Sequence, residues 1–192
     1  MKEFYGPPNP SPPKHKMKPY RSHGSGEFSV NDLKFCGTDV VFESGVMVWH
    51  PETISIASNV YVGHNTMLKG YHRNEMVIGT GSWIGQMCFF HSAGGIIIGK
   101  NVGIGPGVKI LTSTHGEEGI EVPILHSRVD FAPVTIGDDC DLGVGSILLP
   151  GVTLGRGVQV GAGAVVTADL PEFGVAAGVP ARVLRFRPEM KA

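Results

Sequence analysis

Aliphatic residues recur at every sixth position along most of the chain from residue 56 onward, in five sets of three. Two residues before each of them stands a second residue that is small or apolar. A period of six excludes an amphipathic helix, because about 3.6 residues per turn would spread these positions around the helix surface. The first row comprises Ile56, Val62, Leu68, Ile78, Ile84, Phe90, Ile98, Ile104, Ile110, Ile136, Leu142, Leu148, Leu154, Val160 and Val166. The second row comprises Ile54, Val60, Thr66, Met76, Ser82, Cys88, Ile96, Val102, Val108, Val134, Cys140, Ser146, Val152, Val158 and Ala164.

A unit of six residues suits a short strand followed by a turn. Positions i and i−2 of a strand point to the same side of a sheet, so both rows face inward. Three units close a triangular coil of about eighteen residues, and stacked coils pair their backbones and share one core. The pattern therefore predicts an all-β fold, a parallel β-helix of about five to six triangular coils, with Phe42 and Val48 beginning a partial first coil.

Glycine follows the inward residue on two of the three predicted faces and never on the third. It makes up 28 of the 192 residues, about twice the average share. All three breaks in the period fall at the corner without this glycine, after Leu68, Phe90 and Ile110. Insertions confined to one edge of a solenoid usually build its binding face. We therefore expect the functional edge there, formed above all by the loop 111–133.

The same pattern divides the chain into three segments. Residues 1–38 contain a proline-rich stretch and are expected to form an N-terminal arm. Residues 39–170 form the predicted β-helix domain, which includes the loop 111–133. Residues 171–192 follow the last repeat as a C-terminal extension.

The charge balance and the cysteines exclude several classes of protein. Sixteen Lys and Arg against seventeen Asp and Glu leave a net charge of -1, so no strongly basic face is expected and nucleic acid is not an expected partner. No apolar run approaches the roughly 20 residues that span a bilayer, and the N-terminus does not resemble a signal peptide. We expect a cytoplasmic protein. The three cysteines are few and widely spaced, which favours reduced, packed thiols over disulfides or a zinc motif.

Three stretches resemble the hexapeptide-repeat acetyltransferases that act on sugars, among them galactoside and maltose acetyltransferases and the O-acetyltransferases of cell-surface polysaccharide synthesis. They are IGPGVKILTSTHGEEG, VTIGDDCDLGVGSILLPGVTLG and GAGAVVTADLPEFGVAAGVPARVLR. The resemblance implies left-handed winding of the coils and transfer of an acetyl group from acetyl-CoA to a sugar or nucleotide-sugar acceptor. It also implies a homotrimer with acceptor clefts between adjacent subunits.

The resemblance implies that a histidine in the long loop is the general base, and His115 in TSTHGE matches it. A neutral imidazole titrates near the working pH and can take the proton of an attacking hydroxyl. Glu117 or Glu118 could orient this imidazole, although a backbone carbonyl would serve equally well. His91, one coil from the base of the loop, is expected either to bind the acceptor or to fill the corner beside Ser92.

For the cofactor, the resemblance implies small residues along the late coils and basic residues near the C-terminus. The matching positions are Gly143, Ala162, Thr167, Arg182 and Arg185. The arginines suit phosphate recognition through their forked donors. The chain departs from the family at Asp141, where relatives often have an aromatic residue, and at Ala168, where lysine is frequent.

Three other functions remain open at this stage. The first is N-acetylation of an amino sugar attached to a nucleotide. The second is a metal-dependent carbonic anhydrase on the same fold, which needs three convergent histidines, and His64, His91 and His115 supply only the number. The third is a non-catalytic scaffold. We expect no metal site.

Overall fold

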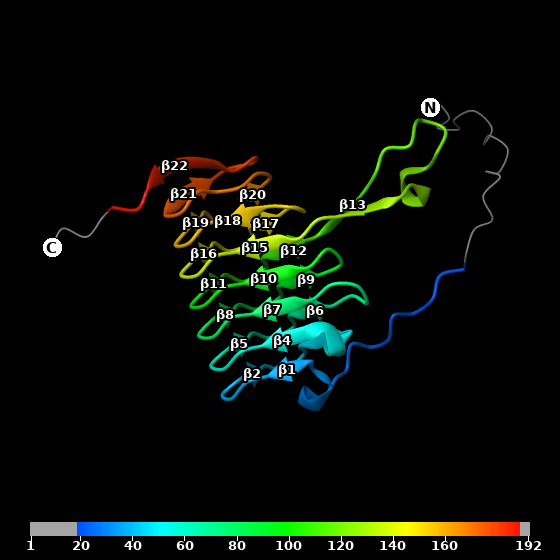
Figure 1. The fold of residues 1–192 in the computed structure, drawn as a ribbon, viewed down its shortest axis with the longest axis horizontal. Coiled ribbons are helices and arrows are strands. Elements are labelled where there is room, and N and C mark those ends of the chain that lie inside the picture. The colour runs from blue at the N-terminus through cyan, green and yellow to red at the C-terminus, as the bar shows by residue number, and fades with distance from the viewer. Residues whose placement is uncertain (1–18, 189–192) are drawn as a thin grey trace, which may run out of the picture.

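The computed structural model describes residues 19–188 of the chain. These residues form a β-solenoid of about seven turns with three parallel sheets, and a long hairpin projects from one side of it (Figure 1). The all-β fold of stacked parallel coils is confirmed, and the expected number of five to six coils is too low. A complete first coil precedes the regular repeat, because Cys36 and Phe42 continue the six-residue spacing that ends at Val48. The handedness of the coils stays a prediction.

We name the three faces of the prism sheets A, B and C, in the order in which each coil passes through them. Sheet A contains β1 (Phe35–Cys36), β4 (Ile54–Ile56), β7 (Met76–Ile78), β10 (Ile96–Ile98), β15 (Val134–Ile136) and β18 (Thr153–Leu154). Sheet B contains β2 (Val41–Phe42), β5 (Tyr61–Val62), β8 (Trp83–Ile84), β11 (Gly103–Ile104), β16 (Asp141–Leu142), β19 (Gln159–Val160), β21 (Gly174–Ala177) and β22 (Arg182–Phe186). Sheet C contains β3 (Met47–Trp49), β6 (Met67–Lys69), β9 (Phe89–His91), β12 (Lys109–Leu111), β17 (Ile147–Leu148) and β20 (Val165–Val166).

Both inward rows are buried along their whole length, as the period predicts. Two of the three hydroxyl side chains of the second row donate hydrogen bonds to the next coil, whereas the buried Ser146 Oγ has no partner in residues 19–188. Thr66 Oγ1 donates to the carbonyl of Gly85 at 2.8 Å, and Ser82 Oγ donates to that of Gly99 at 3.1 Å. Cys140 Sγ lies 3.1 Å from the carbonyl of Gly155 in the same way. All three cysteines are free thiols, and Cys88 and Cys140 are buried packing residues.

Two of the three corners repeat the same backbone conformation on successive coils. One residue with positive φ stands at each turn from sheet A to sheet B and from sheet B to sheet C. These residues are Asp39, Asn59, Gly81, Asn101, Asp139 and Gly157 at the first corner, and Gly45, Asn65, Met87, Gly107, Gly145 and Gly163 at the second. The third corner, from sheet C back to sheet A, has no such regular turn and takes the insertions.

The largest insertion at this third corner is an antiparallel hairpin of β13 (Ser113–His115) and β14 (Val129–Phe131). A short 3₁₀ turn, η3 (Ile124–His126), lies near its tip. The expected irregular loop is therefore ordered into strands at its base, where Ser113 pairs with Phe131, Thr114 with Asp130 and His115 with Val129. In Figure 1 the hairpin extends well beyond the body of the prism.

Both ends of the solenoid are covered by other segments of the chain. At the N-terminal end, Val48 N–H donates to the carbonyl of Gly26 at 2.8 Å, and Phe28 packs edge-on against Phe42 at 5.2 Å. The turn η1 (Val30–Asp32), capped by Ser29, brings buried Leu33 into the core cluster, and η2 (Pro51–Thr53) follows the first coil. Gly26, Phe28 and Leu33 thus pack on the first coil, whose first strand is β1, and the division of the chain at residue 39 stays a prediction.

At the C-terminal end, β21 continues sheet B and β22 runs antiparallel to it. The expected C-terminal extension therefore contains part of the last turn of the solenoid. Over residues 19–188, no helix combines the length and apolar character needed to cross a membrane.

Candidate functional site

Successive coils align three outward side chains at the end of sheet C, beside the corner that carries the hairpin. Lys69, His91 and Leu111 lie in register on β6, β9 and β12. Adjacent parallel strands are about 4.8 Å apart, so these side chains are direct neighbours. His91, proposed from the sequence as a corner residue, stands in the middle of this ladder.

The base of the hairpin is fixed to this corner by a buried threonine. Thr112 Oγ1 donates to the carbonyl of His91 at 2.5 Å and accepts from the N–H of Gly94 at 2.7 Å. The returning strand is held as well, because Ala132 N–H donates to the carbonyl of Thr112 at 3.0 Å. These bonds set the direction in which β13 leaves the prism.

The imidazole of His91 faces the first residue of the hairpin. Its Nδ1 lies 3.4 Å from Ser113 Oγ, at the limit of a hydrogen bond. Partial burial lowers the pKa of His91, and the positive charge of Lys69 lowers this pKa further. His91 is therefore neutral at physiological pH and offers one donor and one acceptor nitrogen.

Aromatic rings surround this histidine and were not singled out from the sequence. The ring of Tyr71, from the insertion after β6, lies 6.4 Å from that of His91 and 6.0 Å from that of Phe131 on β14. Phe89 stacks on His91 at 6.2 Å. From the sequence, only the position of Tyr71 in an insertion at the functional edge could have indicated that it lies near His91. The corner thus combines a neutral imidazole, a cation and an apolar wall.

His115 is the last residue of β13 and is exposed to solvent. It lies two residues after Ser113 on the same strand, so both side chains point to the same face of the hairpin. His115 therefore lies farther from the prism than Ser113 does, on the same face of the hairpin. Within the described part of the chain, the imidazole of His115 accepts or donates no hydrogen bond to another side chain.

The two glutamates after His115 differ in their contacts. Glu118 Oε1 accepts from the backbone N–H of Arg128 at 2.8 Å and so bridges the two sides of the hairpin. Glu117 is exposed. Neither carboxylate is hydrogen-bonded to His115 within residues 19–188, so the orientation of this imidazole by Glu117 or Glu118 stays a prediction.

Three of the five residues predicted to bind the cofactor lie together at the corner between sheets B and C. Gly143 packs directly against the backbone of Gly161 and Ala162, where a side chain on Gly143 would not fit. Gly161 in turn faces Ala177, which pairs with Arg182 on β22. We call Gly143, Ala162 and Arg182 the late-coil strip.

The other two predicted cofactor residues lie apart from this strip. Thr167 follows β20 at the corner between sheets C and A, and Arg185 pairs with Val175 at the end of sheet B. Both are exposed, as is Arg182. Sheet C separates the late-coil strip from the corner where the hairpin leaves, so His115 and this strip occupy different corners of one chain.

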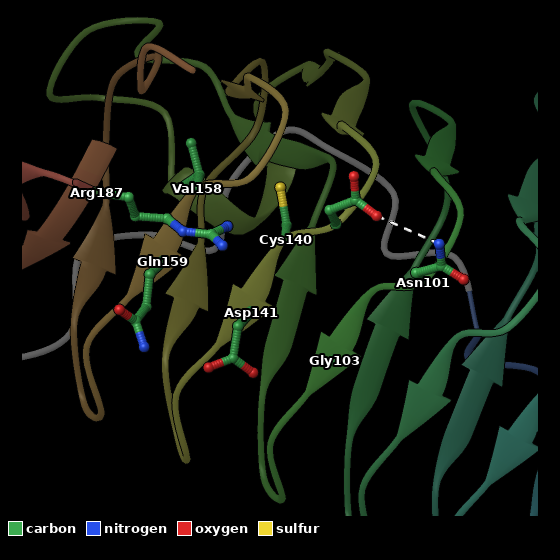
Figure 2. Close-up of a pocket in the computed structure, with 8 residues that line it drawn as sticks. Asn101, Gly103, Cys140, Asp141, Val158, Gln159 and Arg187 are labelled. Atoms are coloured by element: carbon green, nitrogen blue, oxygen red, sulfur yellow. Dashed lines mark hydrogen bonds between the residues drawn. The ribbon is translucent and has the colours of Figure 1, made fainter. Parts of the chain in front are cut away.

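A polar pocket of about 480 Å³ lies on the outer face of sheet B, shown in Figure 2. Asn101, Gly103, Asp139, Asp141, Gln159 and Arg187 line it. Asp139 is held by Arg156 Nη2 at 2.8 Å and by Asn101 Nδ2 at 3.2 Å. The hydrogen bonds from Arg156 and Asn101 keep the pKa of Asp139 below its ordinary value. Sequence reasoning identified Asp141 as a departure from the family but did not predict this pocket.

Among the described residues, no group of three His, Cys, Asp or Glu side chains is placed to hold a metal ion. His91 lies at the third corner, His115 lies out along the hairpin, and His64 is at the corner between sheets B and C, 3.6 Å from Glu43. The structure does not bring the three histidines considered for a metal site together.

Comparison with known proteins agrees with this architecture. A family model described as the hexapeptide repeat of succinyl-transferase matches residues 133–168. A putative acetyltransferase of Schizosaccharomyces pombe is 42% identical over 99 residues, which are 51% of this chain and 46% of the relative. Galactoside O-acetyltransferase of Escherichia coli is 38% identical over 95 residues, 47% of this chain and 43% of the relative. This chain thus matches about half the length of such relatives.

Solved structures share the fold at lower identity. AntD, an N-acyltransferase from Bacillus cereus crystallised as a point mutant with dTDP and coenzyme A, superposes with a TM-score of 0.75 at 23% identity, covering 84% of this chain and 91% of AntD. A hexapeptide-repeat acetyltransferase from Vibrio cholerae complexed with acetyl-coenzyme A gives a TM-score of 0.63 at 23% identity, covering 83% and 74%. At this identity the likeness establishes the shared fold.

Proposed function

Because this chain belongs to the hexapeptide-repeat acetyltransferase family, we propose that it transfers the acetyl group of acetyl-CoA to a hydroxyl group of a sugar or polysaccharide precursor. The proposal takes its reaction from the sequence relatives, which include a galactoside O-acetyltransferase. Its strongest support within the molecule is the contact between His91 and Ser113. His115 lies two residues after Ser113, on the same face of β13.

In this proposal His115 is the general base. Its neutral imidazole takes the proton of the acceptor hydroxyl as the oxygen attacks the thioester carbonyl, and the C–S bond then breaks to release the thiolate of coenzyme A. The protonated imidazole can return its proton to the thiolate, so that each turnover yields one acetyl ester and one thiol. His91 would bind the acceptor as a neutral hydrogen-bonding group, and Glu117 would contact the acceptor or His115.

We assign the cofactor to the late-coil strip, with Thr167 and Arg185 as further contacts. At Gly143 and Ala162 the small side chains would let an extended pantetheine arm approach the backbone closely. Arg182 and Arg185 would meet the phosphates with charged, forked donors. In this proposal acetyl-CoA is a co-substrate, and no metal takes part.

The proposal also requires more than one copy of the chain. His115 and the late-coil strip lie at different corners, so the hairpin of one copy would reach the strip of its neighbour. The apolar side chains of the hairpin are exposed in the single chain, with Ile120 at 99%, Leu125 at 61% and Phe131 at 40%. We propose a homotrimer in which the neighbour covers them. Light scattering during gel filtration tests this, and a monomer at micromolar concentration would contradict it.

N-acetylation of a nucleotide-linked amino sugar is the second candidate. It is favoured by the N-acyltransferase AntD among the structural neighbours and by a tetrahydropyridine-dicarboxylate N-acetyltransferase of Staphylococcus aureus that is 39% identical over 93 residues. Turnover of matched sugars with a hydroxyl or an amine at the same carbon separates the two reactions.

The test of the base uses two histidines of the same hairpin. We expect His115→Ala to lower kcat by about a hundredfold to ten-thousandfold in a thiol-release assay, with the melting temperature unchanged. His126, exposed on η3, is the matched control, and His126→Ala should retain full activity. Equal losses in both variants, or no loss in either, would contradict the role of His115.

A further inference from the structure

The row of outward-facing side chains on sheet B is interrupted at one position. Tyr61, Trp83, Gly103, Asp141 and Gln159 lie in register on five successive strands. Gly103 alone among them has no side chain. Its two neighbours in the row, Trp83 and Asp141, are two strand spacings apart, roughly 9.6 Å. The row is therefore open between an indole and a carboxylate.

The indole of Trp83 presents one free face to this opening. Tyr61 stacks on Trp83 with the rings 5.6 Å apart and 3° from parallel, so it covers one face of the indole. On the next strand Gly103 pairs with Trp83 and has no side chain to cover the other face. Trp83 is 42% exposed, although a large aromatic side chain gains free energy when it is covered.

The opposite wall is polar. The Asp141 carboxylate leans over Gly103, since a Cβ on that glycine would lie 2.8 Å from Asp141 Oδ1. Asp141 and Gln159 make no ion pair or side-chain hydrogen bond with another group in residues 19–188, and both line the pocket on this face (Figure 2). Their oxygens and amide are free to bind a ligand. By contrast, Asn101 and Asp139 on the rim are fixed by bonds to each other.

We propose that the opening between Trp83 and Asp141 binds a pyranose sugar ring. The free indole face would cover the apolar C–H face of the ring. The Asp141 carboxylate would accept hydrogen bonds from neighbouring hydroxyls, and the Gln159 amide would both donate and accept. The polar pocket of about 480 Å³, which Gly103, Asp141 and Gln159 also line, adjoins this opening.

We call this opening the sheet B sugar site, formed by Trp83, Gly103, Asp141 and Gln159. It lies on the side of the prism opposite the corner from which the hairpin leaves (Figure 1). The proposal concerns binding alone and does not rest on acetyl transfer, so a failure of either proposal leaves the other standing.

The experiment titrates the full-length protein, without acetyl-CoA, with methyl glucoside, methyl galactoside and N-acetylglucosamine. Tryptophan fluorescence is the first readout and saturation-transfer NMR the second. The chain has two tryptophans, and Trp49 lies on sheet C with its Nε1–H donated to Gly24. We expect a saturable response to at least one sugar in the millimolar range, with the fluorescence change absent in Trp83→Phe.

Three variants locate the site. Gly103→Leu fills the opening. The backbone of Gly103 has no positive φ, and the added Cβ meets only the Asp141 side chain, which can turn away, so the fold should tolerate the change while sugar affinity falls at least tenfold. Asp141→Asn removes the charge at constant shape and should weaken binding severalfold. The control is Thr153→Leu at the equivalent outward position of β18 on sheet A, which should bind as the wild type does. Circular dichroism verifies that each variant is folded.

Several outcomes would overturn the proposal. These are no saturable response to any of the three sugars in either readout, an equal response to glycerol, or an equal loss in Gly103→Leu and Thr153→Leu. Tighter binding of thymidine than of every sugar would also overturn it, because the site would then recognise a flat base.

Discussion

The prism buries its inward apolar side chains, whereas the hairpin leaves several of its own exposed. Ile104 in β11 is completely buried, as are its counterparts on neighbouring coils, whereas Ile120, Ile124 and Leu125 in the hairpin are more than half exposed. The prism therefore carries its stability within one chain. The hairpin is held through its base at Thr112 and leaves its outer surface available for other molecules. Stability and the proposed general base are thus located in different parts of the chain.

Excising the hairpin should give the largest separation of these two regions. Thr112 and Ala132 are hydrogen-bonded, so a short glycine-rich link can replace residues 113–131. We expect acetyl transfer to fall by about a thousandfold or more, because the general base is lost, while far-ultraviolet circular dichroism retains the β signal. The control keeps the whole hairpin and changes only the exposed His126 to alanine, so that His115 and the apolar side chains of the tip remain. A shortened protein that retains most of its activity would place the site elsewhere.

The second largest effect compares one isoleucine in each region. Ile104→Ala should lower the free energy of unfolding by about 2–5 kcal/mol, since it leaves a cavity in a closely packed core. Ile120→Ala in the hairpin should change it by less than about 0.5 kcal/mol. Urea unfolding at low protein concentration, where association is minimal, measures both. Similar losses at the two positions would show that the hairpin contributes to the core.

A third substitution tests the joint between the regions. Thr112→Val keeps the shape but removes both hydrogen bonds of Oγ1, leaving the N–H of Gly94 and the carbonyl of His91 without this partner. The expected cost is about 1–3 kcal/mol, accompanied by faster hydrogen exchange in β13. Thr112→Ser keeps the hydroxyl group and should therefore retain most of the stability that Thr112→Val loses. Thr114→Val, at an exposed position of the same strand, is the matched control.

The smallest expected effect is on the pH dependence of stability. The pKa of His91 is lower in the folded protein, mainly through burial, so the unfolded chain binds a proton more readily. Its contribution to stability is therefore complete above the ordinary histidine pKa of about 6.5 and is lost as the pH falls through the folded pKa. Between about pH 7.5 and 5.5 the wild-type melting temperature should drop further than that of His91→Gln, by roughly 2 °C or less. Parallel curves would contradict this assignment.

The same division explains what could be predicted from the sequence. The six-residue period predicted the buried rows and the edge that carries insertions, because each coil repeats one local rule. It gave only a partial first coil, because Lys34 interrupts the apolar pattern before β1, and it missed the last coil, which is completed by β21. The approach of Ser113 to His91 depends on where the hairpin is anchored, which no local pattern records. Likewise, the opening at Gly103 depends on which residues of different coils are in register.

The antiparallel strand β22 has a further consequence for the assembly of the molecule. A stack of parallel coils would otherwise end in a row of unpaired backbone groups, which could recruit the end of another stack and grow into a fibre. The antiparallel strand β22 is the edge strand of sheet B, and it presents Arg182 and Arg185, whose like charges oppose the approach of a second such end. The C-terminal strand therefore keeps the stack from growing by addition of other chains. A variant without residues 182–188 should be prone to end-to-end polymerisation.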